Sequence, residues 1–164
     1  MVTQQGDLAL LEHPVAQELL HSPLPVRFAY VRKDGTPEVV PIGFHWNGKE
    51  LVIGTFTQAP KMHALHDGDQ VALTIDTETY PYRVLRMRGR VRTDEVAGIA
   101  PEYEAMTLRT LGEEAGRGWL EQMRPMVSSM ARIFFTPEWV CLQDFETRFP
   151  NELEKAMEAA AAQG

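Results

Sequence analysis

Apolar residues near the start of the chain recur at helical spacing, and the pattern then changes to that of short strands. In residues 7–21 the apolar positions are three or four residues apart, which predicts helix, and Pro14 can open a second helical piece. From residue 26 to 93 the apolar runs are short and separated by turn signals. Two of these signals, Asp34-Gly35 and Asn47-Gly48, favour tight hairpins because their positions need a positive φ.

The strand pattern predicts five strands in this region and a closing hairpin later in the chain. The five predicted strands are Val26–Lys33, Pro37–Trp46, Glu50–Phe56, Gln70–Asp76 and Tyr82–Thr93. Two further runs, Met130–Phe135 and Trp139–Phe145, suggest a hairpin that turns at Thr136-Pro137. Because no long helix separates the early strands, the pattern favours a barrel or a sandwich over a doubly wound parallel sheet.

The remaining segments are predicted as helices that flank this sheet. An inserted helical segment at about 98–124 begins near Pro101 and is interrupted at Gly112, and a C-terminal helix is expected at about 151–162. The chain shows neither an internal repeat nor a linker long enough to separate domains. The sequence therefore predicts one domain over residues 1–164, mostly β, built as a β-barrel with flanking helices.

Composition and charge narrow the classes of function. The 164 residues carry a formal net charge of -7, which argues against a protein that coats nucleic acid or an anionic membrane. Cys141 is the only cysteine, so an intrachain disulfide and a cysteine metal cluster are excluded. His63 and His66 supply too few ligands alone, and no metal site is predicted. No long apolar run follows a basic start, and we expect a cytoplasmic protein without a membrane segment.

Two neighbouring segments have the composition of a ligand site. Pro41 and Gly43 remove a ladder donor and a side chain from the second strand, which permits a flat ligand to approach the backbone. The alternative is an edge strand with a bulge. Thr55 at a strand end and Lys61 near a helix start at Pro60 suggest a phosphate cradle. The alternative for Lys61 is an ordinary solvent-exposed lysine.

Four arginines alternate along the longest predicted strand, at Arg86, Arg88, Arg90 and Arg92. Because successive side chains of a strand point to opposite faces, all four project from one face, while the residues between them face the core. This stripe could bind a phosphate or a polyglutamate-like tail, or pair with carboxylates across a dimer interface. The alternative is a solvated face with cross-strand ion pairs.

The order of these segments resembles the FMN-binding split barrel of the pyridoxamine 5'-phosphate oxidase-like superfamily. The resembling pieces are Asp34-Gly35, the strand Pro37-x-Val-Val-Pro-Ile, Trp46-Asn47-Gly48, Thr55 six residues before Lys61, Asp69–Ile75, Arg83–Arg90, Arg132-Ile133 and Thr136-Pro137-Glu138-Trp139. The match covers roughly residues 23–150, and the order and spacing of the pieces carry it. It implies a split β-barrel and a homodimer that holds two flavins between its subunits.

The resemblance also implies which residues contact the cofactor. The ring would lie along Val39, Val40, Pro41 and Ile42, and Thr55 and Lys61 would hold the phosphate, with Gln58 and Ala59 in the same loop. Arg88 of the arginine stripe is included as a further predicted cofactor contact. No catalytic acid or base is predicted, because the isoalloxazine needs no side-chain nucleophile.

The chain also departs from true pyridoxamine phosphate oxidases. It has Thr147-Arg148-Phe149-Pro150 where they carry a C-terminal Arg-x-His segment, and it lacks their Arg-x-x-x-x-Lys pair on the second strand. Oxidation of vitamin B6 is therefore not expected. The prediction is an FMN-dependent oxidoreductase with an unknown small-molecule substrate. The alternatives are a reductase that uses a 5-deazaflavin coenzyme, or a non-enzymatic flavin- or haem-binding protein.

Overall fold

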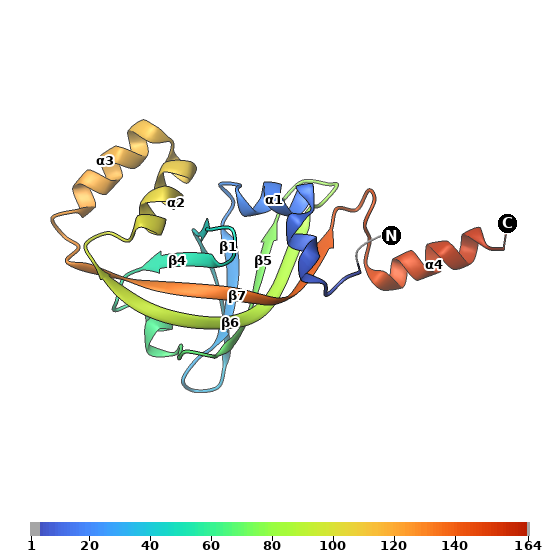
Figure 1. Ribbon diagram of the computed structural model, residues 1–164, viewed down its shortest axis with the longest axis horizontal. Helices are drawn as coiled ribbons and strands as arrows, with labels where there is room; N and C mark the ends of the chain where they lie inside the picture. Colours follow the sequence, from blue (N-terminus) through green and yellow to red (C-terminus); the bar gives the residue numbers. More distant parts are fainter. Residues whose placement is uncertain (1–3, 164) are drawn as a thin grey trace.

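The computed structural model describes residues 4–163 and contains one seven-stranded antiparallel sheet with helices on its outside (Figure 1). The strands are β1 (Val26–Val31), β2 (Pro37–Ile42), β3 (His45–Trp46), β4 (Leu51–Thr55), β5 (Gln70–Asp76), β6 (Val84–Ala97) and β7 (Ser129–Gln143). The α-helices are α1 (Pro14–Leu20), α2 (Pro101–Leu111), α3 (Glu113–Met123) and α4 (Asn151–Ala161), and two short 3-10 helices are η1 (Leu8–Glu12) and η2 (Pro60–His63). No helix within residues 4–163 is long and apolar enough to cross a membrane.

The strand order is β2-β1-β5-β6-β7-β4-β3, and its two edge strands follow each other in the sequence. Only Gly43 and Phe44 separate β2 from β3, and this connection spans at most about 11 Å. The two edges must therefore lie close together, so the sheet curls into a barrel. Its interior is filled by fully buried side chains, among them Phe28, Phe44, Ile53, Leu73, Leu85 and Phe135. The predicted mostly β barrel with flanking helices is confirmed.

The predicted closing hairpin is wrong. Both of its runs belong to the single strand β7, which pairs with β6 from Ala97↔Ser129 to Val84↔Gln143. Thr136-Pro137 does not turn the chain. The ladder instead shifts by one residue, because Arg88 pairs with Trp139 while the next residue of β6 pairs with Pro137. A proline has no N–H to donate, so it is tolerated in a strand at such a bulge.

The second predicted strand, Pro37–Trp46, is divided into β2 and β3 at Gly43-Phe44. Helix α2 packs at this point. An added Cβ on Gly43 would lie 2.4 Å from Sδ of Met106, and one on Gly54 would lie 2.8 Å from Cβ of Tyr103. Both glycines therefore make room for α2, and the space that Gly43 leaves is filled by the chain itself rather than open to a flat ligand.

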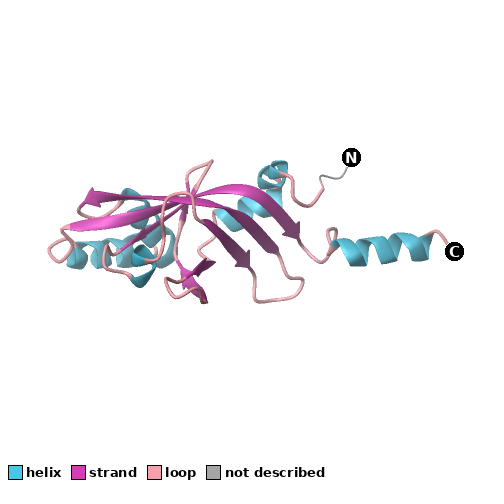
Figure 2. Cartoon of the chain, turned by 90° about the horizontal axis from the view of Figure 1, so that it is seen from below, coloured by secondary structure: helices cyan, strands magenta, loops and turns pink. Residues whose placement is uncertain are grey.

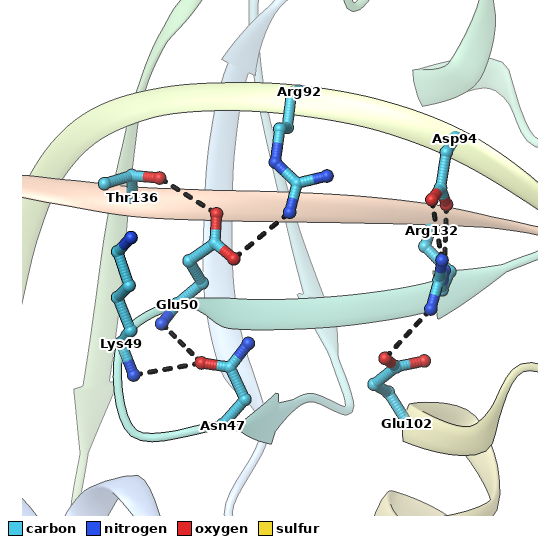
Figure 3. Close-up of polar contacts among 8 residues, drawn as sticks. All are labelled: Asn47, Lys49, Glu50, Arg92, Asp94, Glu102, Arg132 and Thr136. Atoms are coloured by element: carbon cyan, nitrogen blue, oxygen red, sulfur yellow. Dashed lines mark hydrogen bonds and ion pairs between the residues drawn. The ribbon is translucent and has the colours of Figure 1, made fainter.

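Arg132 on β7 fixes α2 over the sheet (Figure 3). Its Nε and Nη2 donate to the Asp94 carboxylate at 2.8 and 2.6 Å, and its Nη1 donates to Oε1 of Glu102 on α2 at 3.1 Å. These hydrogen bonds lower the pKa of Asp94 below its usual 3.8 and raise that of Arg132. Because Arg132 pairs with Gly54 in the ladder, the contact lies at the end of β4.

The depressed pKa of Asp94 predicts a loss of stability in acid. The stabilisation is complete above the ordinary carboxyl pKa of 3.8 and is lost as the pH falls through the lower pKa of the folded protein. We expect the thermal midpoint of the Asp94→Asn variant to fall less between pH 5 and pH 2 than that of the wild type, because the variant has already lost this charged contact. Parallel curves over that range would contradict this role for Asp94.

Candidate functional site

The structure brings together the two residues predicted to hold a phosphate. Thr55 ends β4, and Lys61 lies in η2, six residues later. The Lys61 Nζ lies 3.5 Å from Oγ1 of Thr55. The Thr55 side chain is buried, with 6% of its surface exposed, so its hydroxyl has little access to bulk water. The pair offers an ammonium and a hydroxyl, both suitable donors to a phosphate oxygen.

The loop between Thr55 and Lys61 folds back tightly to make this contact. The Ala59 N–H donates to the Phe56 carbonyl at 3.0 Å, and Pro60 then opens the 3-10 turn that carries Lys61. Gln58 is exposed and Ala59 is half-buried within this loop. Both therefore lie in the loop that joins Thr55 to Lys61, and their predicted contact with the cofactor stays a prediction.

Lys61 carries a positive charge that none of the described residues 4–163 neutralises. Its ammonium is half-buried, and this burial lowers the pKa of Lys61 below the ordinary 10.5. Its one polar contact among residues 4–163 is the Thr55 hydroxyl, and no carboxylate there forms an ion pair with it. A desolvated charge without a counter-ion is costly, and a bound anion would remove that cost. The exposed-lysine alternative does not describe this residue.

The strand predicted to lie along the ring, β2, leads directly toward the strand that carries Thr55. Only two residues separate the end of β2 from β3, and β3 runs antiparallel to β4 with His45 opposite Val52. Within β2 the inward side chains are Val40 and Ile42, which pack against the core. Val39 is 59% exposed, and Pro41 faces outward with it.

Arg88 does not join the Thr55–Lys61 pair within one chain. Thr55 pairs with Ala131, and Ala131 pairs with Glu95 on β6. Arg88 lies seven residues before Glu95, which is about 23 Å along the strand. Its guanidinium instead lies 3.9 Å from the centroid of the Trp139 ring. The cofactor role of Arg88 stays a prediction, and only a second copy of the chain could fulfil it at the same site.

All four arginines of the stripe are exposed on the outer face, as predicted, and they divide into two kinds. Arg90 pairs with Glu138 at 3.0 Å and also donates to the Gly68 carbonyl. Arg92 pairs with Glu50 at 3.2 Å, and Glu50 in turn accepts from Thr136 (Figure 3). Arg90 and Arg92 therefore match the alternative of a solvated face with cross-strand ion pairs.

The other two arginines of the stripe form no ion pair with the described residues 4–163. Arg86 donates to Sγ of Cys141 at 3.2 Å, and Arg88 lies over Trp139. Their guanidinium groups remain available to an anionic partner from outside the chain.

The sequence did not predict the cluster of buried polar groups beneath α2, which is called the polar seam below. Arg109 donates to the Phe44 carbonyl, and burial lowers the pKa of both Arg109 and His45. Three buried atoms in this seam have no partner among residues 4–163, namely Nε of Arg109, Nδ1 of His45 and Oε2 of Glu102. An arginine in the last turn of a helix is an ordinary favourable position, so no sequence signal distinguished Arg109.

The chain is similar to known proteins in both sequence and fold. The sequence profile of the family described as pyridoxamine 5'-phosphate oxidase matches residues 13–144. A solved structure described as an F420 reductase is 26% identical, with a TM-score of 0.56 over 76% of this chain and 94% of that chain. No curated protein sequence matches.

Two other solved structures show likeness of fold alone. A conserved hypothetical protein from Mycobacterium tuberculosis is 16% identical, with a TM-score of 0.61 over 89% of this chain and 91% of that chain. A FAD- and haem-binding protein from Mycobacterium smegmatis is 21% identical, with a TM-score of 0.53 over 85% and 75%. Together with the sheet topology they confirm the predicted split barrel.

Proposed function

Because the chain belongs to the pyridoxamine 5'-phosphate oxidase family, we propose that it is a flavin-dependent oxidoreductase that binds FMN. The observation that supports this most directly is the half-buried, uncompensated Lys61 ammonium next to the Thr55 hydroxyl. That donor set fits a phosphate group, since a phosphate dianion supplies both the counter-charge and the hydrogen-bond acceptors.

Each predicted site residue has a role in this proposal. Lys61 and Thr55 bind the phosphate, and Gln58 and Ala59 line the loop around it. The backbone of β2 from Val39 to Ile42 forms a wall for the ring, because only two residues separate its end from β3, the strand paired with β4. A bound flavin supplies the hydride-transfer chemistry.

The proposed assembly is a homodimer, in which the second copy completes the site. Within one chain the Thr55–Lys61 pair lies at one end of the barrel and Arg88 lies about 23 Å along the sheet. Arg88 therefore enters the cofactor proposal only as a contact from the second copy.

A 5-deazaflavin coenzyme is the second candidate. The F420 reductase is 26% identical over 76% of this chain, which is more than a likeness of fold, and its name states its cofactor. The exposed guanidinium groups of Arg86 and Arg88 would suit the anionic tail of such a coenzyme.

Titration of the purified protein with FMN and, separately, with the deazaflavin coenzyme distinguishes these candidates. We expect FMN to bind with quenching of its fluorescence and in a ratio of one per chain. Preferential binding of the deazaflavin would establish the second candidate. A protein that binds neither, or that binds riboflavin as tightly as FMN, would contradict the phosphate site and with it the proposed function.

A further inference from the structure

Helix α2 packs on β3 and β4 at the end of the molecule away from α4 (Figures 1 and 2). Two charged residues of α2, Glu102 and Arg109, are seven positions apart, and an α-helix completes nearly two turns over that distance. Both therefore lie on one face of α2. Met106 lies between them on that face and fills the space at Gly43, so this is the face that packs on the sheet.

His45 of β3 lies close to both of these charges in the polar seam. Burial lowers the pKa of His45 most, the Arg109 charge lowers it further, Glu102 raises it, and His21 at the end of α1 lowers it. The neighbouring strand β4 places the uncharged Val52 opposite His45. The charges that act on the ring from α2 are therefore one that favours its protonation and one that opposes it.

The three unpartnered atoms of the polar seam complement one another in pairs. Nε of Arg109 only donates, Oε2 of the Glu102 carboxylate only accepts, and Nδ1 of His45 does either, according to its protonation. Without a proton Nδ1 is an acceptor, which suits Arg109. With a proton it is a donor, which suits Glu102. In the structure the ring pairs with neither, and one ring nitrogen cannot serve both at once.

The rest of each charged side chain is held in place. Nη2 of Arg109 donates to the Phe44 carbonyl, and Oε1 of Glu102 accepts from Arg132 at 3.1 Å. A buried polar atom without a hydrogen bond destabilises the folded state, and native structures contain few of them. One unpaired donor and one unpaired acceptor beside a titratable ring therefore require an explanation.

We propose that His45 is a proton switch for the seating of α2 on the sheet. The neutral ring accepts a hydrogen bond from Arg109 and so holds the last turn of α2 on β3. The protonated ring donates to Glu102 and repels Arg109, and the last turn of α2 then leaves the sheet. Glu102 keeps its place in both states, because Arg132 bridges it to Asp94.

The last turn of α2 is the end of the helix that is free to respond. Gly112 follows it directly with a φ of 81°, and α3 begins at the next residue. A change at this joint moves the end of α2 while its first turn stays fixed on β7 through Arg132. The movement is the conformational change that the proton would control.

Proton linkage gives the direction and the upper limit of the effect. While α2 is seated, the pKa of His45 lies below the ordinary 6.5, and in the open state the ring is in water and its pKa returns to that value. The stability of the seated state is therefore complete above pH 6.5 and is lost as the pH falls from 6.5 toward the lowered pKa. Between these two values the open population rises by at most about tenfold per pH unit.

Hydrogen–deuterium exchange of the purified full-length chain without added flavin tests the switch. The amides of residues 106–111 are followed at pH 7.5, 6.5 and 5.5 in the wild type and in His45→Asn, and comparison at equal pH cancels the intrinsic exchange rate. Asparagine keeps a polar atom near the position of Nδ1 but does not titrate. We expect the ratio of wild-type to variant exchange rates to rise severalfold, and at most about tenfold, from pH 6.5 to 5.5.

His63→Asn, which removes an exposed histidine, is the matched control and should exchange like the wild type at each pH. A ratio of wild-type to His45→Asn rates that does not change with pH would overturn the proposal. So would a wild type that is protected more strongly in acid than the variant.

NMR titration of the His45 ring tests the choice between its two partners. Arg109→Met should raise the pKa of His45 and Glu102→Gln should lower it, whereas Arg117→Met at an exposed position of α3 should leave it unchanged. Glu102→Gln is nearly isosteric and provides the test even if Arg109→Met does not fold. An unchanged pKa in Glu102→Gln, or shifts of the same sign in both variants, would overturn the proposal.

Both measurements are independent of the proposed function, because neither needs a bound cofactor. A chain that binds no flavin but shows the pH-dependent exchange would retain the switch and lose the phosphate site. A chain that binds FMN through Lys61 but shows no such exchange would do the reverse.

Discussion

Replacing Lys61 with alanine is expected to weaken cofactor binding by roughly 10- to 100-fold, the usual contribution of one charge-assisted hydrogen bond. The reason is specific to this lysine. Its ammonium is half-buried beside Thr55 and has no carboxylate partner among residues 4–163, so in the proposed site the phosphate serves as its counter-ion. Fluorescence titration with FMN measures the effect. Lys49→Ala removes an exposed lysine and serves as the matched control, with no change expected.

Stability of the free protein separates binding from folding for this variant. Because the Lys61 ammonium is desolvated without compensation, Lys61→Met should leave the free energy of unfolding of the cofactor-free protein unchanged or raise it. A variant that binds FMN as tightly as the wild type would remove Lys61 from the site. A variant that unfolds would instead show that the ammonium supports the loop from Thr55 to Pro60.

The lowered pKa of Lys61 adds a pH dependence to the same test. In the free protein the amine loses its proton below the ordinary 10.5, and the neutral amine attracts a phosphate dianion less. FMN affinity should therefore fall as the pH rises through that lowered pKa. Lys61→Arg keeps its charge at high pH, so its affinity should fall much less over the same range.

Prolines, glycines and turn dipeptides in the sequence predicted most of the helices and turns correctly. Pro14 opens α1, Pro101 opens α2, and Gly112 ends α2 with a positive φ of 81°. The Asp34-Gly35 and Asn47-Gly48 turns join β1 to β2 and β3 to β4. Each of these signals depends only on the backbone preferences of the residues themselves, so the rest of the fold is not needed to interpret them.

The sequence pattern could not predict contacts between segments that lie far apart in the chain. Gly43 appeared to leave room for a ligand, and nothing near it in the chain indicates that Met106 of α2 fills that room. The strand end at Thr55 and the helix start at Pro60 suggested a phosphate cradle with Lys61, but only the family's order of segments favoured it over an exposed lysine. Spacing alone does not show that the lysine is desolvated, because its burial depends on how the loop folds onto the barrel.

The false hairpin in β7 has a definite physical origin. Before Glu138 the core-facing residues of β7 have odd numbers, as in Ile133 and Phe135, and after it they have even numbers, as in Val140 and Leu142. Such a change of phase in the sequence resembles two strands joined by a turn. In the structure Glu138 is the one extra residue of a bulge, and the partner strand β6 continues with an unbroken alternation.

Gly89→Ala is expected to lower the free energy of unfolding by at least about 2 kcal/mol. Gly89 lies on β6 at this bulge, and an added Cβ would lie 2.0 Å from the Thr136 carbonyl oxygen and 2.9 Å from the Phe135 ring. The oxygen belongs to the backbone of β7 and cannot move without separating the two strands. Urea unfolding followed by circular dichroism measures the loss.

Gly118→Ala on α3 is the matched control, because an added Cβ there meets nothing within 4 Å. Alanine is the better helix former, so this variant should gain up to about 1 kcal/mol. Equal effects of the two substitutions would contradict the close approach at the bulge.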